Sequence, residues 1–316
     1  MTLPRRAVVT GSLAGLAAGL LPRTARAANL IPQRASSRVI VDNDFAGDPD
    51  GLVALAHQLL SPKARVALIT TTALNAKFVE PALAGRAAAA GAAIARECAA
   101  LAGRRDIAIV PGPETFDAAP SPAARAIVAE ALHDDPLPLF VTCGGPLTNV
   151  AAALRLEPAI ARRMTVVWIG GGGYPDGGWE YNLATDPAAA RAVIEDSAVP
   201  LWQVPQPAYR QMQFSVAEMA ADMRGISPLG SWLYERFTHP PAFIDVGGAW
   251  PLGDSPLVLL TAVSAESSHA VERTARRIGA DVRYGEEIAG RTVRVFEQLD
   301  VRLAWADFLA KLRLAG

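Results

Sequence analysis

Short apolar runs alternate with Ala-rich segments along most of the chain. The apolar runs are rich in Val, Ile and Leu and lie at 38–42, 65–71, 107–110, 138–142, 165–169 and 200–204. The Ala-rich segments have helical composition and lie chiefly at 82–102, 121–132, 148–155 and 186–196. Continuously apolar strands that alternate with helices are typical of a parallel sheet covered on both faces. The pattern therefore predicts an α/β fold, related to the Rossmann class, with a mostly parallel central sheet and helices on both faces.

Two later stretches depart from this alternation. Residues 205–250 are irregular, with scattered aromatic residues and prolines, and we expect a pair of helices and a loop that cover the site there. Residues 303–314 have the apolar spacing of a closing amphipathic helix. In open parallel sheets, ligands bind beyond the carboxyl ends of the strands, so functional residues are expected at that edge.

The first 28 residues have the layout of an export signal. Arg5 and Arg6 precede a short uncharged stretch, and small residues then offer a cleavage site. The paired arginines indicate the twin-arginine route, which leads to the periplasm or beyond. An uncleaved membrane anchor is the alternative, although the stretch is short for a membrane span. We divide the chain into a signal peptide (1–28), a linker (29–37) and one main domain (38–316), with no stable membrane insertion after cleavage.

Charge and composition limit the classes of partner. The whole chain has 30 basic and 31 acidic residues, and loss of the predicted signal, with its four arginines, takes the formal net charge from −1 to −5. This mild acidity argues against nucleic acid as a partner. Hydrophobic residues make up 51% of the chain, enough for a sizeable core. Cys98 and Cys143 are too few for a disulfide framework, and whether they pair is open.

A cluster of acidic residues follows the first predicted strand. Asp42, Asp44, Asp48 and Asp50 lie within nine residues, between the strand and an apolar helix. Carboxylates this close repel one another unless a hard cation or a hydrogen-bonding ligand lies among them. Ligation by oxygen alone favours Ca²⁺ or Mg²⁺ over zinc. A solvated acidic turn with helix-capping Asp residues is the alternative.

Five segments in order give this chain its resemblance to a known family. They lie at 42–51, 69–75, 145–158, 180–187 and 253–257, and read DNDFAGDPDG, ITTTALN, GPLTNVAAALRLEP, EYNLATDP and GDSPL. Together they resemble the nucleoside hydrolase family, the inosine–uridine preferring type and its relatives. The likeness runs from about residue 38 to about residue 265.

The resemblance implies an enzyme that hydrolyses the N-glycosidic bond of ribonucleosides or related ribosides, releasing base and ribose. It implies a Ca²⁺ ion held by Asp44, the backbone carbonyl of Gly144 and Asp254, with Asp44 also taking the proton of the attacking water. Asn75, Glu180 and Asn182 match the sugar-binding residues of the family. A homodimer or homotetramer is implied as well.

Two departures from the family pattern change this expectation. The opening motif of the family usually ends in two adjacent aspartates, but here Asp50 is followed by Gly51, so one metal-binding carboxylate is missing. We expect Asp48 to replace it as a metal ligand and Asp50 to face the sugar. The residue before the late aspartate is often a His that can assist departure of the base, but here it is Gly253. The aromatic residues near the expected site are Trp179, Tyr181, Tyr209 and Trp250, which could hold an aglycone by stacking.

Several of these polar residues have structural interpretations. Asn75 could close a turn after its strand, Asn149 could brace the helix at 148–155, and Asp186 precedes Pro187 as a helix N-cap would. Asp42 could be a buried structural partner. His57 and His269 are expected in helical surroundings, as packing or surface residues.

Two other functions stay open at this point. Asp-x-Asp after a strand also begins the haloacid dehalogenase-like phosphatases, which need a later basic residue and a further acidic pair. The 145–158 and 180–187 segments have no role in that chemistry. The other alternative is a secreted nucleoside- or sugar-binding protein that has kept the pocket without turnover.

Overall fold

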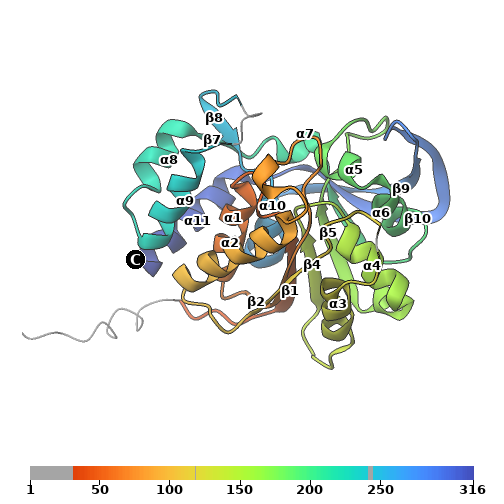
Figure 1. The fold of residues 1–316 in the computed structure, drawn as a ribbon, viewed down its shortest axis with the longest axis horizontal. Helices are drawn as coiled ribbons and strands as arrows, with labels where there is room; N and C mark the ends of the chain where they lie inside the picture. The colour runs from red at the N-terminus through yellow and green to blue at the C-terminus, as the bar shows by residue number, and fades with distance from the viewer. Residues whose placement is uncertain (1–30, 118, 241–244) are drawn as a thin grey trace, which may run out of the picture. The chain divides into compact units, whose positions relative to one another are not determined.

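The strands of the central sheet follow the predicted apolar runs. The computed structural model describes residues 31–117, 119–240 and 245–316, and residues from Arg34 onward form one unit. In this unit β1 (Ser37–Asn43), β2 (Ala64–Thr71), β3 (Ala108–Pro111), β4 (Leu139–Cys143), β5 (Met164–Ile169) and β6 (Leu201–Val204) pair in parallel. The predicted α/β class is confirmed (Figure 1). The predicted signal peptide lies outside the described residues, so export stays a prediction.

Two further strands extend the sheet at one side. β10 (Tyr284–Gln298) pairs in parallel with β6, and β9 (His269–Ile278) pairs antiparallel with β10 as the edge strand. The order across the sheet is β3-β2-β1-β4-β5-β6-β10-β9. The apolar pattern did not predict this pair, because charged residues interrupt both strands and most of their side chains are not fully buried. His269 therefore lies on a strand rather than near a helix, and its side chain is exposed.

Helices cover both faces of the sheet, as predicted. On one face, Val39 and Val41 of β1 pack in a core with α1 (Asp50–Leu59), α2 (Ala87–Leu101) and α11 (Val301–Ala315). On the other face, Ile40 packs in a second core with α3 (Pro122–Leu132), α4 (Thr148–Leu156) and α6 (Pro187–Ile194). Adjacent β1 residues thus point into different cores, which explains why the strand is apolar throughout.

The remaining elements are short and join these layers. They are α5 (Tyr181–Thr185), α10 (Pro256–Val258), the π-helical turn η4 (Leu259–Val263), and the 3₁₀ turns η2 (Pro81–Leu83) and η3 (Pro158–Arg162). The predicted helix at 82–102 begins later, at Ala87, after Gly85 with φ 70°. Among the described residues, no helix is long and apolar enough to cross a membrane.

The irregular stretch contains the expected helices. It forms α7 (Gln206–Tyr209), β7 (Gln213–Ser215), α8 (Val216–Asp222), α9 (Pro228–Phe237) and β8 (Ala249–Pro251), with β7 and β8 paired antiparallel. The two longer helices, α8 and α9, lie beside α11 (Figure 1), whereas the shorter α7 lies next to the site. The expected cover is therefore supplied by α7 and the β8 end rather than by the helix pair.

Buried polar bonds hold the strand ends in position. Asp42 is fully buried and accepts hydrogen bonds from Thr70 Oγ1 (2.6 Å) and Asn149 Nδ2 (2.8 Å). Asn149 also donates to the carbonyl of Thr71, so it ties α4 to β1 and β2. The structural interpretations of Asp42 and Asn149 are confirmed. Cys98 and Cys143 are both buried and unpaired, which answers the question of pairing.

Candidate active-site pocket

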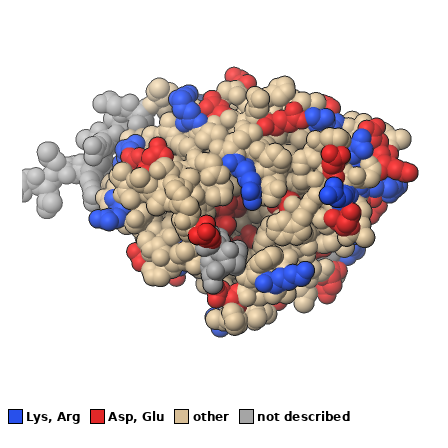
Figure 2. All heavy atoms as spheres, turned by 90° about the horizontal axis from the view of Figure 1, so that it is seen from above, with Lys and Arg blue, Asp and Glu red and all other residues tan. Residues whose placement is uncertain are grey.

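A pocket of about 290 Å³ opens at the carboxyl ends of the central strands. Figure 2 looks onto this end of the molecule, and acidic side chains are visible at the bottom of a hollow near the middle of the view. The lining comes from the β1–α1 loop, Gly144 after β4, Ile169 of β5, the start of α5, α7 and the Pro251–Asp254 segment. This is the edge at which ligands bind in open parallel sheets.

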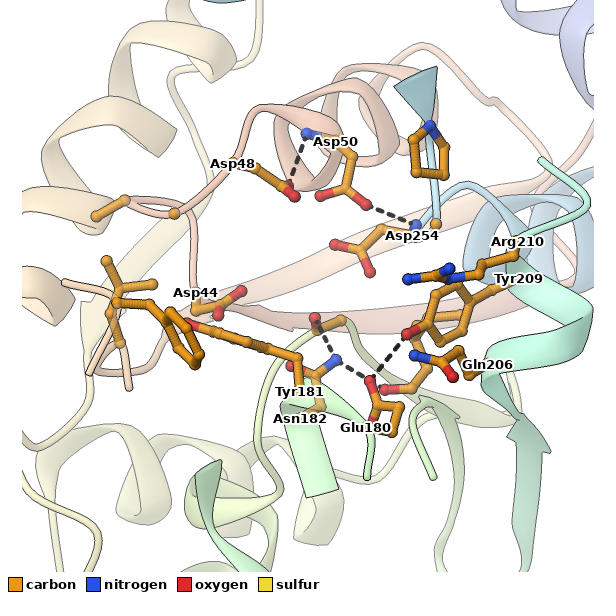
Figure 3. A pocket seen from close by; sticks show the side chains of 18 of the residues that line it. Asp44, Asp48, Asp50, Glu180, Tyr181, Asn182, Gln206, Tyr209, Arg210 and Asp254 are labelled. Atoms are coloured by element: carbon orange, nitrogen blue, oxygen red, sulfur yellow. Dashed lines mark hydrogen bonds between the residues drawn. The ribbon is translucent and has the colours of Figure 1, made fainter. Parts of the chain in front are cut away.

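Six carboxyl side chains line the pocket: Glu80 and five that we call the acidic floor, namely Asp44, Asp48, Asp50, Glu180 and Asp254 (Figure 3). Burial and the neighbouring Asp48 raise the pKa of Asp44 to about 8. Burial, then the charge of Asp254, raises the pKa of Asp50 well above its ordinary value, and burial does the same for Asp254. Because each charge opposes the others, the floor favours a cation or retained protons.

One basic side chain lies near the negative charge of the acidic floor. Among the described residues that line the pocket, Arg210 is the single Lys or Arg. Figure 3 shows its guanidinium directed toward the pocket from the end of α7. One guanidinium cannot neutralise five carboxylates, so the floor keeps a strong negative potential when its groups are ionised.

The β1–α1 loop brings Asp48, the expected metal ligand, and Asp50, the expected sugar-facing residue, to the pocket. The Asp48 carboxylate accepts a hydrogen bond from the backbone N–H of Asp50 (3.3 Å). The Asp50 carboxylate in turn accepts from the backbone N–H of Asp254 (3.2 Å), across 204 positions of sequence. Both side chains line the pocket, and Asp50 is the one fixed against Asp254.

Asn43 is a site residue that the sequence did not reveal. Its side chain is buried, its Nδ2 donates to Asp254 Oδ2 (2.8 Å), and its Oδ1 accepts from the N–H of Asp44 (2.7 Å). It therefore holds two members of the acidic floor. Its position between two aspartates was the available signal, but nothing in the pattern shows that its amide reaches a residue 211 positions later.

Glu180 and Asn182 are held at the start of α5. Glu180 accepts from the N–H groups of Gly171 (2.8 Å) and Leu183 (2.9 Å), and from the Tyr209 hydroxyl (3.1 Å). Asn182 donates to the carbonyls of Gly144 (3.0 Å) and Ile169 (2.9 Å). Burial raises the pKa of Glu180 although these hydrogen bonds oppose the shift.

Asn75 and Asp186 lie outside the pocket lining. The Asn75 amide donates to Thr185 Oγ1 (3.1 Å), and its oxygen accepts from the N–H of Lys77 (3.0 Å). Asp186 caps α6 by accepting from the N–H of Ala189 (2.9 Å), and it also accepts from Thr148 Oγ1 (2.6 Å). Asp186 is thus confirmed as an N-cap, while the Asn75 side chain closes a turn in the structure.

Four aromatic side chains line the pocket, and three of them are linked by ring contacts; we call these three the aromatic rim: Phe78, Trp179 and Tyr181. Phe78 contacts Trp179 edge-on (6.4 Å between ring centroids) and Tyr181 at a tilt (5.8 Å). Trp179 is 56% exposed, so its ring is available to a ligand. Phe78 was not among the aromatic residues expected at the site. Trp250 was expected there, but it is buried against Phe237 and does not line the pocket.

The donors present fit a hard divalent cation in their chemistry. Asp44, Asp48, Asp254 and the Gly144 carbonyl offer only oxygen, which suits Ca²⁺ or Mg²⁺. Within the described residues, however, no three His, Cys, Asp or Glu side chains already form a group arranged to hold a metal ion. A bound ion would therefore need oxygen ligands from the backbone, substrate or water besides the carboxylates.

Comparisons with known proteins identify a family. The family model described as inosine-uridine preferring nucleoside hydrolase matches residues 39–308. A curated relative, the inosine-uridine preferring nucleoside hydrolase of Crithidia fasciculata, is 37% identical over 86 residues, which are 26% of this chain and 26% of the relative. The matched segment thus spans about a quarter of that relative's length.

Solved structures share the fold over nearly their whole length. A plant nucleoside hydrolase, PpNRh1, superposes with a TM-score of 0.70 at 20% identity, covering 88% of this chain and 99% of that one. An inosine-uridine preferring nucleoside hydrolase from Bacillus anthracis gives a TM-score of 0.66 at 17% identity, covering 88% and 99%. The haloacid dehalogenase-like alternative has no support from these matches. With a family match over most of its length and the expected site at the expected edge, this chain belongs to the inosine-uridine preferring nucleoside hydrolase family.

Proposed function

We propose that the protein is a Ca²⁺-dependent hydrolase of the N-glycosidic bond of ribonucleosides or related ribosides. The observation that carries the proposal is the pocket, which is lined by both the acidic floor and the aromatic rim. Polar oxygens suit the hydroxyls of a sugar, and an aromatic surface suits the face of a base. A glycosidic bond joins those two parts, so the pocket fits both sides of the bond to be broken.

The acidic floor suits the chemistry of this bond. Asp44, Asp48, Asp254 and the Gly144 carbonyl are the proposed calcium ligands. A bound calcium ion would orient the attacking water and the ribose hydroxyls. Asp44 takes a proton from that water, whose oxygen bonds to the anomeric carbon as the carbon–nitrogen bond breaks and its electron pair leaves with the base. Positive charge that develops on the sugar is stabilised by the surrounding carboxylates.

Sugar recognition falls to Asp50, Glu180 and Asn182, which line the pocket. Glu180 and Asn182 are already fixed by backbone partners, so they lose little freedom when a sugar binds. Buried polar groups left unpaired would penalise sugars that lack the matching hydroxyls. Asn75 keeps a supporting role in this proposal, because its amide is bonded to Thr185 and not directed at the pocket.

The His that often precedes the late aspartate in the family, and can assist departure of the base, is replaced here by Gly253. No His or Lys is present among the described lining residues, and a carbon of the Tyr209 ring lies 3.1 Å from where a side chain at Gly253 would begin. Burial and the neighbouring Glu180 raise the pKa of the Tyr209 hydroxyl, which makes it a weak proton donor. The preferred substrates are therefore ribosides whose aglycone leaves readily without protonation by the enzyme.

A substrate screen tests the function. The purified protein with Ca²⁺ is incubated with purine and pyrimidine nucleosides, other ribosides and phosphomonoesters, while reducing sugar and phosphate are measured. Release of ribose from nucleosides or ribosides supports the proposal. Binding in a calorimeter without ribose release would instead identify a nucleoside-binding protein, and phosphate release would contradict both.

Export and assembly complete the proposal. We propose twin-arginine export to the periplasm or beyond, on the strength of Arg5 and Arg6, and a homodimer or homotetramer, as the family resemblance implies. A fusion of residues 1–35 to a folded reporter should leave the cytoplasm, and replacement of both arginines by Lys should stop it. Unchanged export of the Lys variant would contradict the route. Light scattering of the purified protein gives the oligomeric state.

A further inference from the structure

The glycine at residue 51 is explained by a contact with a side chain from outside its own helix. It is in the first turn of α1, and its backbone does not have the positive φ that favours glycine. Glycine in a helix costs about 1 kcal/mol relative to alanine, so a spatial reason is needed. A Cβ atom at residue 51 would lie 2.9 Å from both Nδ2 and Oδ1 of Asn43. The space of a side chain at residue 51 is already filled by that amide.

Gly144 faces the same amide from another side. A Cβ atom there would overlap Asn43 Nδ2 and the carboxylate of Asp254. Asn43 therefore lies between two glycines, one at the start of α1 and one after β4, and is 1% exposed. Its two polar ends are both used, by Asp254 Oδ2 and by the N–H of Asp44.

We propose that Asn43 takes the place of the side chain missing at residue 51 and acts there as a neutral positioning residue for Asp44 and Asp254. Where the family motif usually has a second acid at the start of α1, this chain has Gly51, and the Asn43 amide from β1 fills that space. The metal consequence rests on the function proposed above: an acid at residue 51 would add a negative charge close to Asp44 and Asp254, so the same site with that acid would hold a divalent cation more tightly.

A double-mutant cycle of thermal stability tests whether Asn43 fills the space of a side chain at residue 51. Thermal unfolding is measured without metal for wild type, Gly51→Ala, Asn43→Ala and the double variant. Gly51→Ala alone should lower Tm, because its methyl group overlaps the amide. In the Asn43→Ala background the same change should raise Tm, because the overlap is gone and alanine favours the helix. Equal effects of Gly51→Ala in both backgrounds would overturn the proposal.

Gly91 offers a matched control. It is a helical glycine of α2, and its Cβ would meet Ala46 N (3.3 Å) and Phe45 Cβ (3.5 Å), not Asn43. Gly91→Ala should change Tm by the same amount in both backgrounds. The proposal fails if Asn43→Ala alters the effect of Gly91→Ala on Tm as strongly as it alters the effect of Gly51→Ala. That result would reflect a general loosening of the loop.

A calorimetric Ca²⁺ titration tests the consequence for charge. Asn43→Ala with Gly51→Asp should bind Ca²⁺ at least about tenfold more tightly than Asn43→Ala alone, because the added charge now has room. Gly51→Asp in the wild-type background should give no such gain. A gain of equal size in both backgrounds would overturn the positioning role. If no variant binds Ca²⁺, the proposed metal site fails, while the stability cycle still decides the placement of Asn43.

Discussion

The acidic floor and the aromatic rim of the pocket are held in place by different interactions. Asp50, Glu180 and Asp254 are tied to backbone N–H groups or to the Asn43 amide, in segments far apart in the sequence. The rim residues contact one another through their rings, the Tyr181 hydroxyl accepts a backbone hydrogen bond from Asn75 (3.4 Å), and Trp179 is more than half exposed. A fixed floor suits chemistry that needs exact placement, whereas an adaptable rim suits bases of different size. Substitutions should therefore separate turnover, metal binding and base preference.

The largest effect is expected at Asp44. Asp44→Asn should lower kcat by about 10³-fold, because the amide cannot take the proton of the attacking water. Ribose release from the best nucleoside of the screen measures this. Circular dichroism of the variant checks that the fold is kept. Near-normal turnover would remove Asp44 from the role of base.

The next effect separates Asp254, Asp48 and Asp50 by metal binding. Asp254→Ala should lose most of the bound Ca²⁺, and Asp48→Asn should weaken binding by at least about tenfold, since a neutral amide replaces a charged ligand. Asp50→Asn should spare the metal and raise KM. Calcium and substrate titrations of each variant distinguish these outcomes. If Asp48→Asn binds Ca²⁺ as wild type does and Asp50→Asn does not, the two roles are exchanged.

A smaller effect is expected at the rim. Trp179→Ala should raise KM by about twofold to tenfold, the range expected for one aromatic contact. Calcium affinity should not change, because no carboxylate is disturbed. Leu101→Ala is a suitable control, since Leu101 is an exposed apolar residue outside the pocket. A loss of calcium binding in Trp179→Ala would show that floor and rim are not separable.

The smallest effect concerns pH and lies away from the pocket. His57 is buried and its Nε2 lies 2.7 Å from Asp307 Oδ2, with Lys311 also bonded to Asp307. Burial lowers the pKa of His57 below the unfolded value of about 6.5, so the unfolded chain binds the extra proton first. Stability from this residue is complete above pH of about 6.5 and is lost as the pH falls through the lower folded pKa.

Thermal unfolding at pH 7.5 and pH 5.5 tests this linkage. Between pH 7.5 and pH 5.5 the Tm of wild type should fall a few degrees further than the Tm of His57→Gln. Parallel pH dependence of the two proteins would assign the acid sensitivity to other groups. Because His57→Gln leaves the acidic floor unchanged, the pH dependence of Tm that remains in this variant comes from groups other than His57.

The sequence predicted what depends on periodicity and on short motifs. Continuous Val and Ile runs gave the six central strands, and the acidic segment after β1 gave Asp44, Asp48 and Asp50 at the pocket. Other features depend on contacts across the fold. Asn43 reaches Asp254 from 211 positions away, and Phe78 meets Trp179 only after two loops fold together. β9 and β10 were missed because an edge hairpin with exposed charged residues lacks the apolar signature of a central strand.

The Asn182 amide has a consequence that extends beyond sugar recognition. It bonds to the Gly144 carbonyl after β4 and to the Ile169 carbonyl of β5. The residue proposed to contact the sugar is thus joined directly to the carbonyl proposed to contact the metal. A ligand that draws on one amide hydrogen changes how firmly that carbonyl is held. If nucleoside and cation bind as proposed, any effect of one on the affinity of the other is reciprocal and of the same factor, so the two binding events form a linked equilibrium.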